Sequence, residues 1–292
     1  MLKGFTCPDW GEEPGRNNNI EYCVNHCSMP CVAPPFLKAM MAEEEANPHK
    51  GKIISVTMLT GGCKRKTALE RTQDYYLVPD KKLPTFRGTL VHSLVERGNK
   101  KEMTEKGWII EKNLLLPVKT KSGRWKLSGT PDYVDTENRV LYDIKTLQEY
   151  AVMKLVTGQE KGTWSDHISD SYVKQLNIYR YMGKRLNKFE VDKLKLQIFA
   201  FGRLILTGTR VKLRVRNGRY YEEQEFDVPD IPILDDSLIE SWIHYEGDEW
   251  YNILFNEAKA PVCPEEWKWL CKSCIFNGTA DCPDPDFERE LS

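Results

Sequence analysis

The spacing of apolar and polar residues predicts a chain in which helices and strands follow one another from about residue 64 onwards. We expect, in chain order, helices over 64–77 and 87–103, strands over 108–118, 125–134 and 140–146, helices over 147–156 and 169–186, strands over 194–201, 203–215 and 220–228, and a helix over 235–257. Asn217-Gly218 is a tight-hairpin signal between the last two strands. This order predicts an α/β fold with a mixed central β-sheet flanked by helices.

Charge is distributed unevenly along the 292 residues, although the formal net charge is only -1. The range 50–126 holds 18 Lys and Arg against 7 Asp and Glu, whereas 222–292 holds 4 basic against 19 acidic residues. Such a split allows a basic face to bind a polyanion, with the acidic part facing away. The alternative is that both stretches are ordinary solvated surface.

The beginning of the sequence has no apolar run of the length that a signal peptide or a membrane helix needs, so we expect a cytoplasmic protein without a membrane partner. Disulfides are rare in that compartment. The nine cysteines therefore favour thiolates that hold a metal or a cluster.

Three segments are expected from composition. Residues 1–50 form a small cysteine-rich N-terminal module, 51–260 the main core, and 261–292 a cysteine-rich tail. The first module has few aliphatic residues, so something besides a hydrophobic core must order it. We expect a zinc site there, on ligands grouped as Cys7, Cys23, Cys27 and Cys31, with His26 nearby. The alternative is a flexible module with reduced thiols.

Two aspartates and a lysine carry the strongest chemical signal. Asp132 follows Gly129-Thr130-Pro131, and eleven residues later comes Asp143-Ile144-Lys145. On a strand, Asp143 and Lys145 point to the same side. Carboxylates arranged in this way can hold Mg²⁺ or Mn²⁺ for phosphodiester hydrolysis, and the lysine can orient water or stabilise charge on the phosphate. Taken alone, the pattern also fits a surface ion pair.

Two helices supply further candidates. His92 lies in the helix expected over 87–103, and Gln175 and Tyr179 stand one turn apart on the helix expected over 169–186. A helix histidine is often structural, and a Gln-Tyr pair often lies at the edge of a core. Asp135 is out of phase with Asp132 on its strand and is expected to be a turn residue. Glu111 fits either a further acid of the site or a charge at a strand end.

Together these motifs resemble the PD-(D/E)XK nuclease superfamily, in particular its RecB-like branch, over about residues 55–183. The resemblance implies a restriction-endonuclease-like core. It also implies cation ligands at His92, Asp132, Asp143 and the Ile144 carbonyl. Lys145 would be the catalytic lysine, and Gln175 with Tyr179 would position the DNA strand or the lysine.

The tail adds a C-x2-C-x7-C pattern in Cys271, Cys274 and Cys282. Three thiolates need a fourth ligand, for which Cys63 is the candidate. This layout resembles the RecB-like nucleases with iron-sulfur clusters, namely AddB-type helicase-nuclease subunits and CRISPR-adaptation exonucleases, and the resemblance implies a [4Fe-4S] cluster on these four cysteines. Ligand chemistry alone fits zinc equally well. Cys263 is left over as a small apolar residue or a replacement ligand.

The function expected from these features is a Mg/Mn-dependent deoxyribonuclease, an exonuclease acting on single-stranded DNA ends. Basic residues expected along the DNA are Lys64, Arg65, Lys66, Arg71 and Arg87. The alternative is a catalytically silent DNA-end-binding or scaffold subunit of a recombination, repair or CRISPR-adaptation complex. No G-x-x-x-x-G-K-[ST] motif occurs, so unwinding would need a helicase partner.

Overall fold

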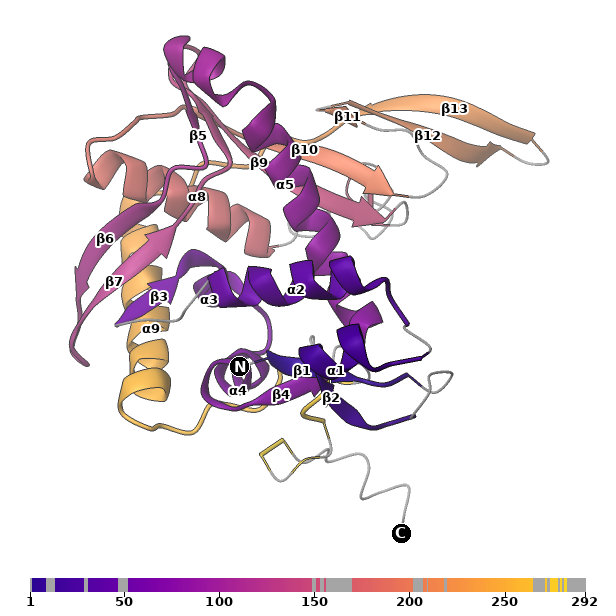
Figure 1. Ribbon diagram of the computed structural model, residues 1–292. Coiled ribbons are helices and arrows are strands. Elements are labelled where there is room, and N and C mark those ends of the chain that lie inside the picture. The colour runs from indigo at the N-terminus through magenta and orange to yellow at the C-terminus, as the bar shows by residue number, and fades with distance from the viewer. Residues whose placement is uncertain are drawn as a thin grey trace. The chain divides into compact units, whose positions relative to one another are not determined.

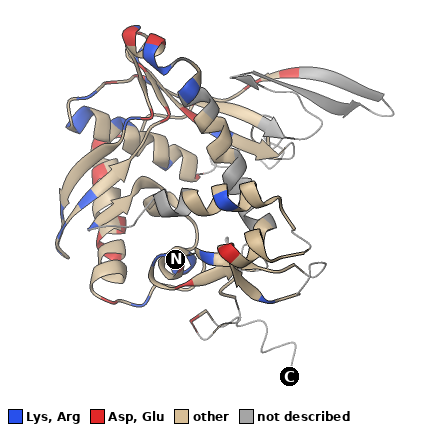
Figure 2. Cartoon of the chain, in the orientation of Figure 1, with Lys and Arg blue, Asp and Glu red and all other residues tan. Residues whose placement is uncertain are grey.

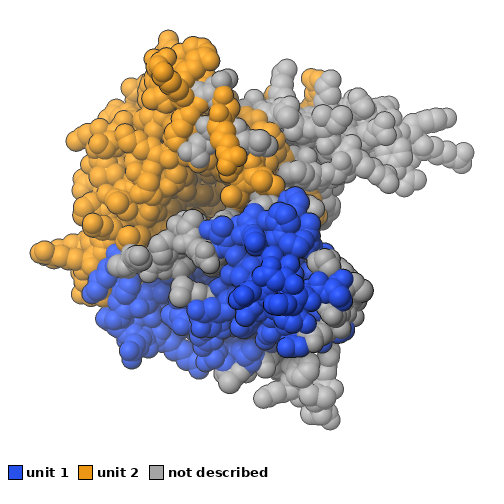
Figure 3. Space-filling model, in the orientation of Figure 1, with its two compact units in different colours: residues 1–52, 61–86, 252–292 blue, residues 53–60, 87–251 orange. Residues whose placement is uncertain are grey.

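The computed structural model describes residues 2–8, 14–28, 31–46, 52–148, 151–152, 155, 170–201, 207–208, 210–217, 220–264, 271, 274–277, 279 and 281–282. The chain forms two compact units (Figure 3). Unit 1 comprises Met1–Lys52, Gly61–Phe86 and Asn252–Ser292, and unit 2 comprises Ile53–Thr60 and Arg87–Tyr251. The N-terminal and C-terminal cysteine segments, expected as separate modules, thus fall in one unit together with residues 61–86.

Unit 1 contains a three-stranded sheet in the order β2-β1-β4. Its elements are β1 (Leu2–Thr6), β2 (Asn17–Asn19), α1 (Ile20–Asn25), α2 (Pro34–Ala46), α4 (Lys64–Thr72) and β4 (Tyr75–Leu77). Strand β1 pairs antiparallel with β2 and parallel with β4. A helix was expected over 64–77, but it ends at Thr72. The β-prone Tyr75-Tyr76-Leu77 instead joins the sheet, where Tyr75 pairs with Leu2 of β1.

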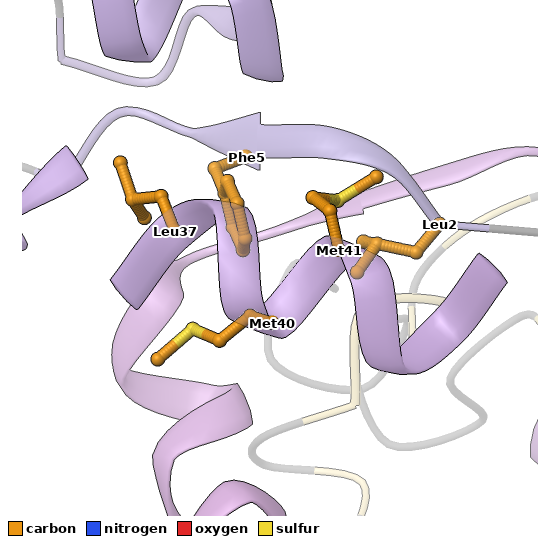
Figure 4. Packing of buried hydrophobic residues seen from close by; sticks show 5 residues of the cluster. All are labelled: Leu2, Phe5, Leu37, Met40 and Met41. Carbon is orange, nitrogen blue, oxygen red and sulfur yellow. The ribbon is translucent and has the colours of Figure 1, made fainter. Parts of the chain in front are cut away.

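A small apolar core supports this sheet (Figure 4). Leu2 and Phe5 of β1 pack with Leu37, Met40 and Met41 of α2, and all five side chains are buried. The positions on α2 follow helical spacing, which puts them on one face. Cys23 of α1 packs against this cluster as a partly buried neighbour.

Unit 2 is built on a mixed five-stranded sheet (Figure 1). Its strands are β5 (Trp108–Ile110), β8 (Tyr133–Asp135), β9 (Val140–Gln148), β10 (Lys193–Phe201) and β11 (Thr207–Gly208). Their order is β11-β10-β9-β8-β5, with β9 and β10 parallel and the other pairs antiparallel. The central β9 buries residues on both faces, as expected for a strand covered on both sides. The expected mixed α/β class is confirmed.

A second, three-stranded sheet of unit 2 has the order β3-β7-β6. It contains β3 (Ile53–Ser55), β6 (Leu114–Lys119) and β7 (Arg124–Gly129). The strands expected over 108–118 and 125–134 are therefore each two strands, which belong to different sheets. Glu111 breaks the first with a φ of 43°, and Pro131, which lacks an N–H, falls in the break of the second. Across this double break, the Glu111 N–H donates to the Asp132 carbonyl at 2.9 Å.

The remaining elements of the chain are α3 (Val56–Thr60), α5 (Pro79–Glu105), α8 (Asp170–Arg185), β12 (Arg210–Asn217), β13 (Tyr220–Asp227) and α9 (Asp236–Phe255). Strands β12 and β13 form the expected antiparallel hairpin. Helix α5 begins at Pro79 rather than at residue 87, because Pro is favoured at a helix start. Of the helix expected over 147–156, residues 147–148 belong to β9, and most of the rest lies outside the described residues.

Helix α8 is fixed in unit 2 by its buried face and by a buried amide. Asn177 is fully buried, and its side chain donates to the carbonyls of Val173 and Pro232 and accepts from the Leu234 N–H, at 2.8–2.9 Å. Helix α9, which carries many of the acidic residues of the 222–292 stretch (Figure 2), packs on Trp125 at Gly247. No described helix combines the length and apolarity that crossing a bilayer requires.

Candidate functional site

Three potential metal ligands meet in unit 2 where the chain passes between the two sheets. His92 comes from α5, Glu111 from the break after β5, and Asp132 from the break before β8. His92 Nδ1 lies 3.2 Å from Asp132 Oδ1 and 3.3 Å from Glu111 Oε1. One ligand atom from each residue can be chosen so that all lie within 4.8 Å of one another. The three side chains therefore form a possible metal-binding triad.

The carboxylate of Asp132 also connects the triad to β9. Asp132 Oδ2 accepts a hydrogen bond from the Ile144 N–H at 2.5 Å. The pairing of β8 with β9 extends only from Tyr133 to Asp135, so this side chain takes the place of the next backbone partner. The structure therefore uses the N–H of Ile144, and the expected cation-binding role of its carbonyl stays a prediction.

Asp143 and Lys145 flank Ile144 on β9 and form an ion pair, with 2.6 Å between Asp143 Oδ2 and Lys145 Nζ. Asp143 is only 2% exposed. A carboxylate removed from water to this extent is costly unless a positive charge or hydrogen bonds compensate it. Lys145 supplies that compensation, and the same-side geometry expected from strand alternation is present.

Lys145 is held in turn by α8. Its Nζ donates to Gln175 Oε1 at 3.0 Å, and Gln175 Nε2 donates to the Tyr179 hydroxyl at 3.2 Å. The Lys145 ammonium also lies 4.9 Å from the ring centroid of Tyr172, a cation–π distance. Residues 172, 175 and 179 share one helix face, so α8 presents a continuous cradle to the lysine. Of the two roles expected for Gln175, contact with the lysine is the one observed.

Burial and neighbouring charges perturb the acid–base properties of these groups. Burial raises the pKa of Asp143 to about 6, against the opposing charge of Lys145. Burial lowers the pKa of Lys145, but the charge of Asp143 and its hydrogen bond outweigh burial and raise it. The hydrogen bond to Asp132 raises the pKa of His92, with further contributions from the charges of Asp132 and Glu111. The raised pKa of Lys145 keeps the proton of the Asp143–Lys145 pair on nitrogen, and the raised pKa of His92 favours its protonated form.

The turn before Asp132 depends on a glycine. A Cβ at Gly129, the last residue of β7, would lie 2.7 Å from Tyr179 Cε1 and 2.7 Å from Val56 Cγ2. Only a hydrogen at this position lets β7 approach α8 so closely. The Tyr179 hydroxyl also interacts with the backbone of Thr130, so the tyrosine ties the turn to the helix that cradles Lys145.

The triad suits a hard divalent cation. Carboxylate oxygens are preferred by Mg²⁺ and Mn²⁺, and imidazole is accepted by Mn²⁺ and other first-row metals. Asp143 lies close enough to Asp132 and His92 for their charges to shift its pKa, although it is paired with Lys145. A cation next to these acids would offset the burial of Asp143, so the residues fit the metals expected from sequence.

The sequence did not predict every residue of the site. For Glu111 the sequence allowed either a further acid of the site or a charge at a strand end. The structure favours the first, because the Glu111 carboxylate contacts His92. Tyr172 was missed, although its position one turn before Gln175 on the same helix face could have indicated it. Asp135 has the expected turn role, since its carboxylate accepts the N–H groups of Glu137 and Asn138.

The C-terminal cysteines and Cys63 are in electrostatic contact within unit 1. Burial raises the pKa of Cys263, and hydrogen bonds with the thiols of Cys63 and Cys271 add to this effect. Burial also raises the pKa of Cys282, with contributions from the charges of Cys274, Cys63 and Cys271. Cys263, to which the sequence assigned no metal-binding partner set, therefore lies beside two of the four expected ligands, Cys63 and Cys271.

The expected DNA-binding residues differ in their availability. Arg65 is only 6% exposed, and its Nε and Nη2 donate to the Ala260 carbonyl at 3.1 and 2.8 Å. It therefore anchors the segment after α9 rather than contacting phosphate, which corrects the expectation. Lys66 pairs with Glu70 at 2.7 Å but remains partly exposed. Lys64 and Arg71 are half-buried, and the side chain of Arg87 lies outside the described residues.

Comparison with protein families and with curated proteins finds no match for this chain. A solved structure described as "Crystal structure of SSO0001" is similar over 82% of this chain and 91% of that chain, with 16% sequence identity and a TM-score of 0.42. Identity and score at this level establish neither a shared fold nor a shared function.

Proposed function

We propose that this protein is a metal-dependent DNA nuclease of the PD-(D/E)XK type, with a restriction-endonuclease-like core, that acts as an exonuclease on single-stranded DNA ends. The observation that carries the proposal is the junction of the His92–Glu111–Asp132 triad with the Asp143–Lys145 pair through Ile144. Cation ligands and an ammonium group that converge at one place can support metal-dependent phosphodiester hydrolysis.

Each residue of the site has a role in this proposal. His92, Glu111 and Asp132 would hold the cation, with Asp143 as the neighbouring acid. Bound Mg²⁺ or Mn²⁺ would supply Lewis acidity toward the phosphodiester. Lys145, held by Gln175 and Tyr172, would orient the attacking water or stabilise negative charge on the phosphate. Burial of the pair excludes bulk water and strengthens these interactions.

Unit 1 would contribute a [4Fe-4S] cluster and DNA contacts. Its cluster ligands would be Cys63, Cys271, Cys274 and Cys282. Soft thiolates select iron-sulfur clusters or zinc, and such a group would join the helix start at Cys63 to the tail. Lys64, Lys66 and Arg71 would contact DNA phosphates, which predicts strong salt dependence of binding.

The test compares two Asp–Lys ion pairs whose lysines lie on the adjacent strands β9 and β10. Asp143→Asn and Asp143→Ala alter the candidate site, whereas Asp230→Asn alters the control pair, in which Asp230 lies 3.3 Å from Lys195 and is exposed. The assay follows end-labelled single-stranded DNA with Mn²⁺, using protein purified anaerobically, and circular dichroism confirms that each variant is folded.

We expect the cleavage rate of the Asp143 variants to fall at least about a hundredfold, because removing one catalytic electrostatic group typically has an effect of this size. They should still bind DNA in the absence of cleavage, and Asp230→Asn should cleave like the wild type. Wild-type cleavage by a folded Asp143→Ala protein would overturn the proposed site. Binding of DNA ends by a wild-type protein that never cleaves would favour the scaffold alternative.

A further inference from the structure

The four N-terminal cysteines come together in unit 1, and the proposed function uses none of them. Cys7 follows β1, Cys23 lies in α1, Cys27 follows α1, and Cys31 precedes α2. All four line one cavity of about 20 Å³, together with Phe5, Thr6, Asn18 and Leu37. Four cysteines from separate segments of the chain thus surround a single small space.

Backbone hydrogen bonds hold these cysteines in place. The Cys7 N–H donates to the Arg16 carbonyl at 2.8 Å, and the Gly15 N–H donates to the Cys7 carbonyl at 2.9 Å. The Cys27 N–H donates to the Tyr22 carbonyl at 3.1 Å, in the last turn of α1. The spacing of four residues between Cys23 and Cys27 therefore places both at the same end of α1, beside the end of β1.

The thiols also interact electrostatically. Burial raises the pKa of Cys23 to about 11, and the charges of Cys31, Cys27 and Cys7 raise it further. Burial likewise raises the pKa of Cys31, with contributions from Cys7 and Cys27. Thiolates that line one cavity repel one another unless a cation lies between them. A metal that binds all four would reverse these effects.

The cavity suits a single ion. Its volume of about 20 Å³ is on the order of the space that one water molecule needs, so four cysteines around it can close on one ion. Among single ions, a closed tetrahedral set of four cysteines is the usual structural zinc site.

We propose that Cys7, Cys23, Cys27 and Cys31 bind one structural Zn²⁺ that ties β1, α1 and the start of α2 together. The small core of Leu2, Phe5, Leu37, Met40 and Met41 (Figure 4) shares Phe5 and Leu37 with the lining of this cavity. So few apolar side chains give a segment of this length little stability by themselves. The zinc would therefore supply part of the folding free energy of residues 2–46.

The test measures zinc and iron in the full-length wild type and in three variants. Cys7→Ser/Cys31→Ser removes two ligands, Cys31→His keeps a zinc-compatible set, and His26→Ala changes the exposed residue next to Cys27 as a matched control. We expect a loss of about one zinc per chain in the double serine variant only, with iron unchanged. Equal zinc in the wild type and the double serine variant, or a loss of iron instead, would overturn the proposal.

A second measurement covers the case in which the serine variant does not fold. Wild-type protein loaded with Co²⁺ in place of zinc should give the visible absorption of a tetrahedral thiolate site, and the Cys31→His protein should give a shifted spectrum. Absence of the tetrahedral spectrum in the wild type would contradict the site. Neither readout depends on DNA cleavage, so failure of the nuclease proposal and failure of this one are distinguishable.

Discussion

Replacing Gly129 by alanine tests how closely β7 must approach α8 for the lysine cradle to form. The added Cβ would lie 2.7 Å from both Tyr179 Cε1 and Val56 Cγ2, whereas carbon atoms in good contact are about 3.5–4.0 Å apart. Tyr179 is only 4% exposed, so it has little room to move away. Overpacking of this kind costs about 1–3 kcal/mol, so we expect Gly129→Ala to lower the free energy of unfolding by about 2 kcal/mol.

The same substitution should weaken cleavage. A displaced Tyr179 would shift its hydrogen bond to Gln175, and Gln175 would then hold Lys145 less firmly. Loss of geometry by about 1 Å can reduce a rate on the order of a hundredfold. The predicted signature is therefore a joint loss of stability and of cleavage rate, with DNA binding retained.

Urea denaturation followed by circular dichroism measures the stability, and Gly98→Ala provides the control. A Cβ at Gly98, within α5, meets nothing within 4 Å, so alanine there should raise the free energy of unfolding by up to about 1 kcal/mol. Val56→Ala should cost less stability in the Gly129→Ala protein than in the wild type, because there it also removes one of the two clashing groups. Wild-type stability of Gly129→Ala alone would refute the steric argument.

Three further predictions concern other parts of the molecule. The pKa of His92 is raised, so its ion pairs are fully present below the ordinary histidine pKa and are lost as pH rises through the raised value. Because Mn²⁺ binds only the neutral imidazole, its affinity should increase about tenfold per pH unit up to that value. A Mn²⁺ affinity that calorimetry finds independent of pH would contradict this prediction. Arg65→Met should lower the free energy of unfolding by about 1–3 kcal/mol, because the charged hydrogen bonds to the Ala260 carbonyl are lost. Unchanged stability together with weaker DNA binding would instead show that Arg65 contacts DNA. Cys263→Ser should keep the iron content of the wild type, while loss of iron would make this thiol a cluster ligand in place of one of the four.

Sequence patterns predicted the elements of unit 2 better than their arrangement. The strand alternation correctly put Asp143 and Lys145 on one side of β9, because that relation depends on local backbone geometry alone. Polar residues interrupt both predicted strands, at Glu111-Lys112-Asn113 and from Ser128 to Asp132, but a short polar run does not by itself divide one strand into two. The break depends on a left-handed residue and on which strands pair, and strand pairing is a property of the whole fold.

The set of residues that meet at the site was likewise predictable in part. Lysine and carboxylates at short spacing indicated phosphate chemistry, but the choice between two roles for Glu111 needed the distance to His92. Arg65 and Lys66 are neighbours of equal charge in the sequence, and yet one is buried against Ala260 and the other is partly exposed. Helical phase at the start of α4 separates them, and only the packing of the segment after α9 reveals which one is covered.

The central claim, that unit 2 carries a metal-dependent nuclease site centred on Lys145, is tested most directly by single-turnover cleavage of end-labelled single-stranded DNA with Mn²⁺. The comparison is between Lys145→Met and Lys195→Met, two lysines of adjacent strands that each pair with an aspartate. The account predicts a loss of at least about a hundredfold for Lys145→Met and a wild-type rate for Lys195→Met. Equal rates for the two folded variants would contradict it.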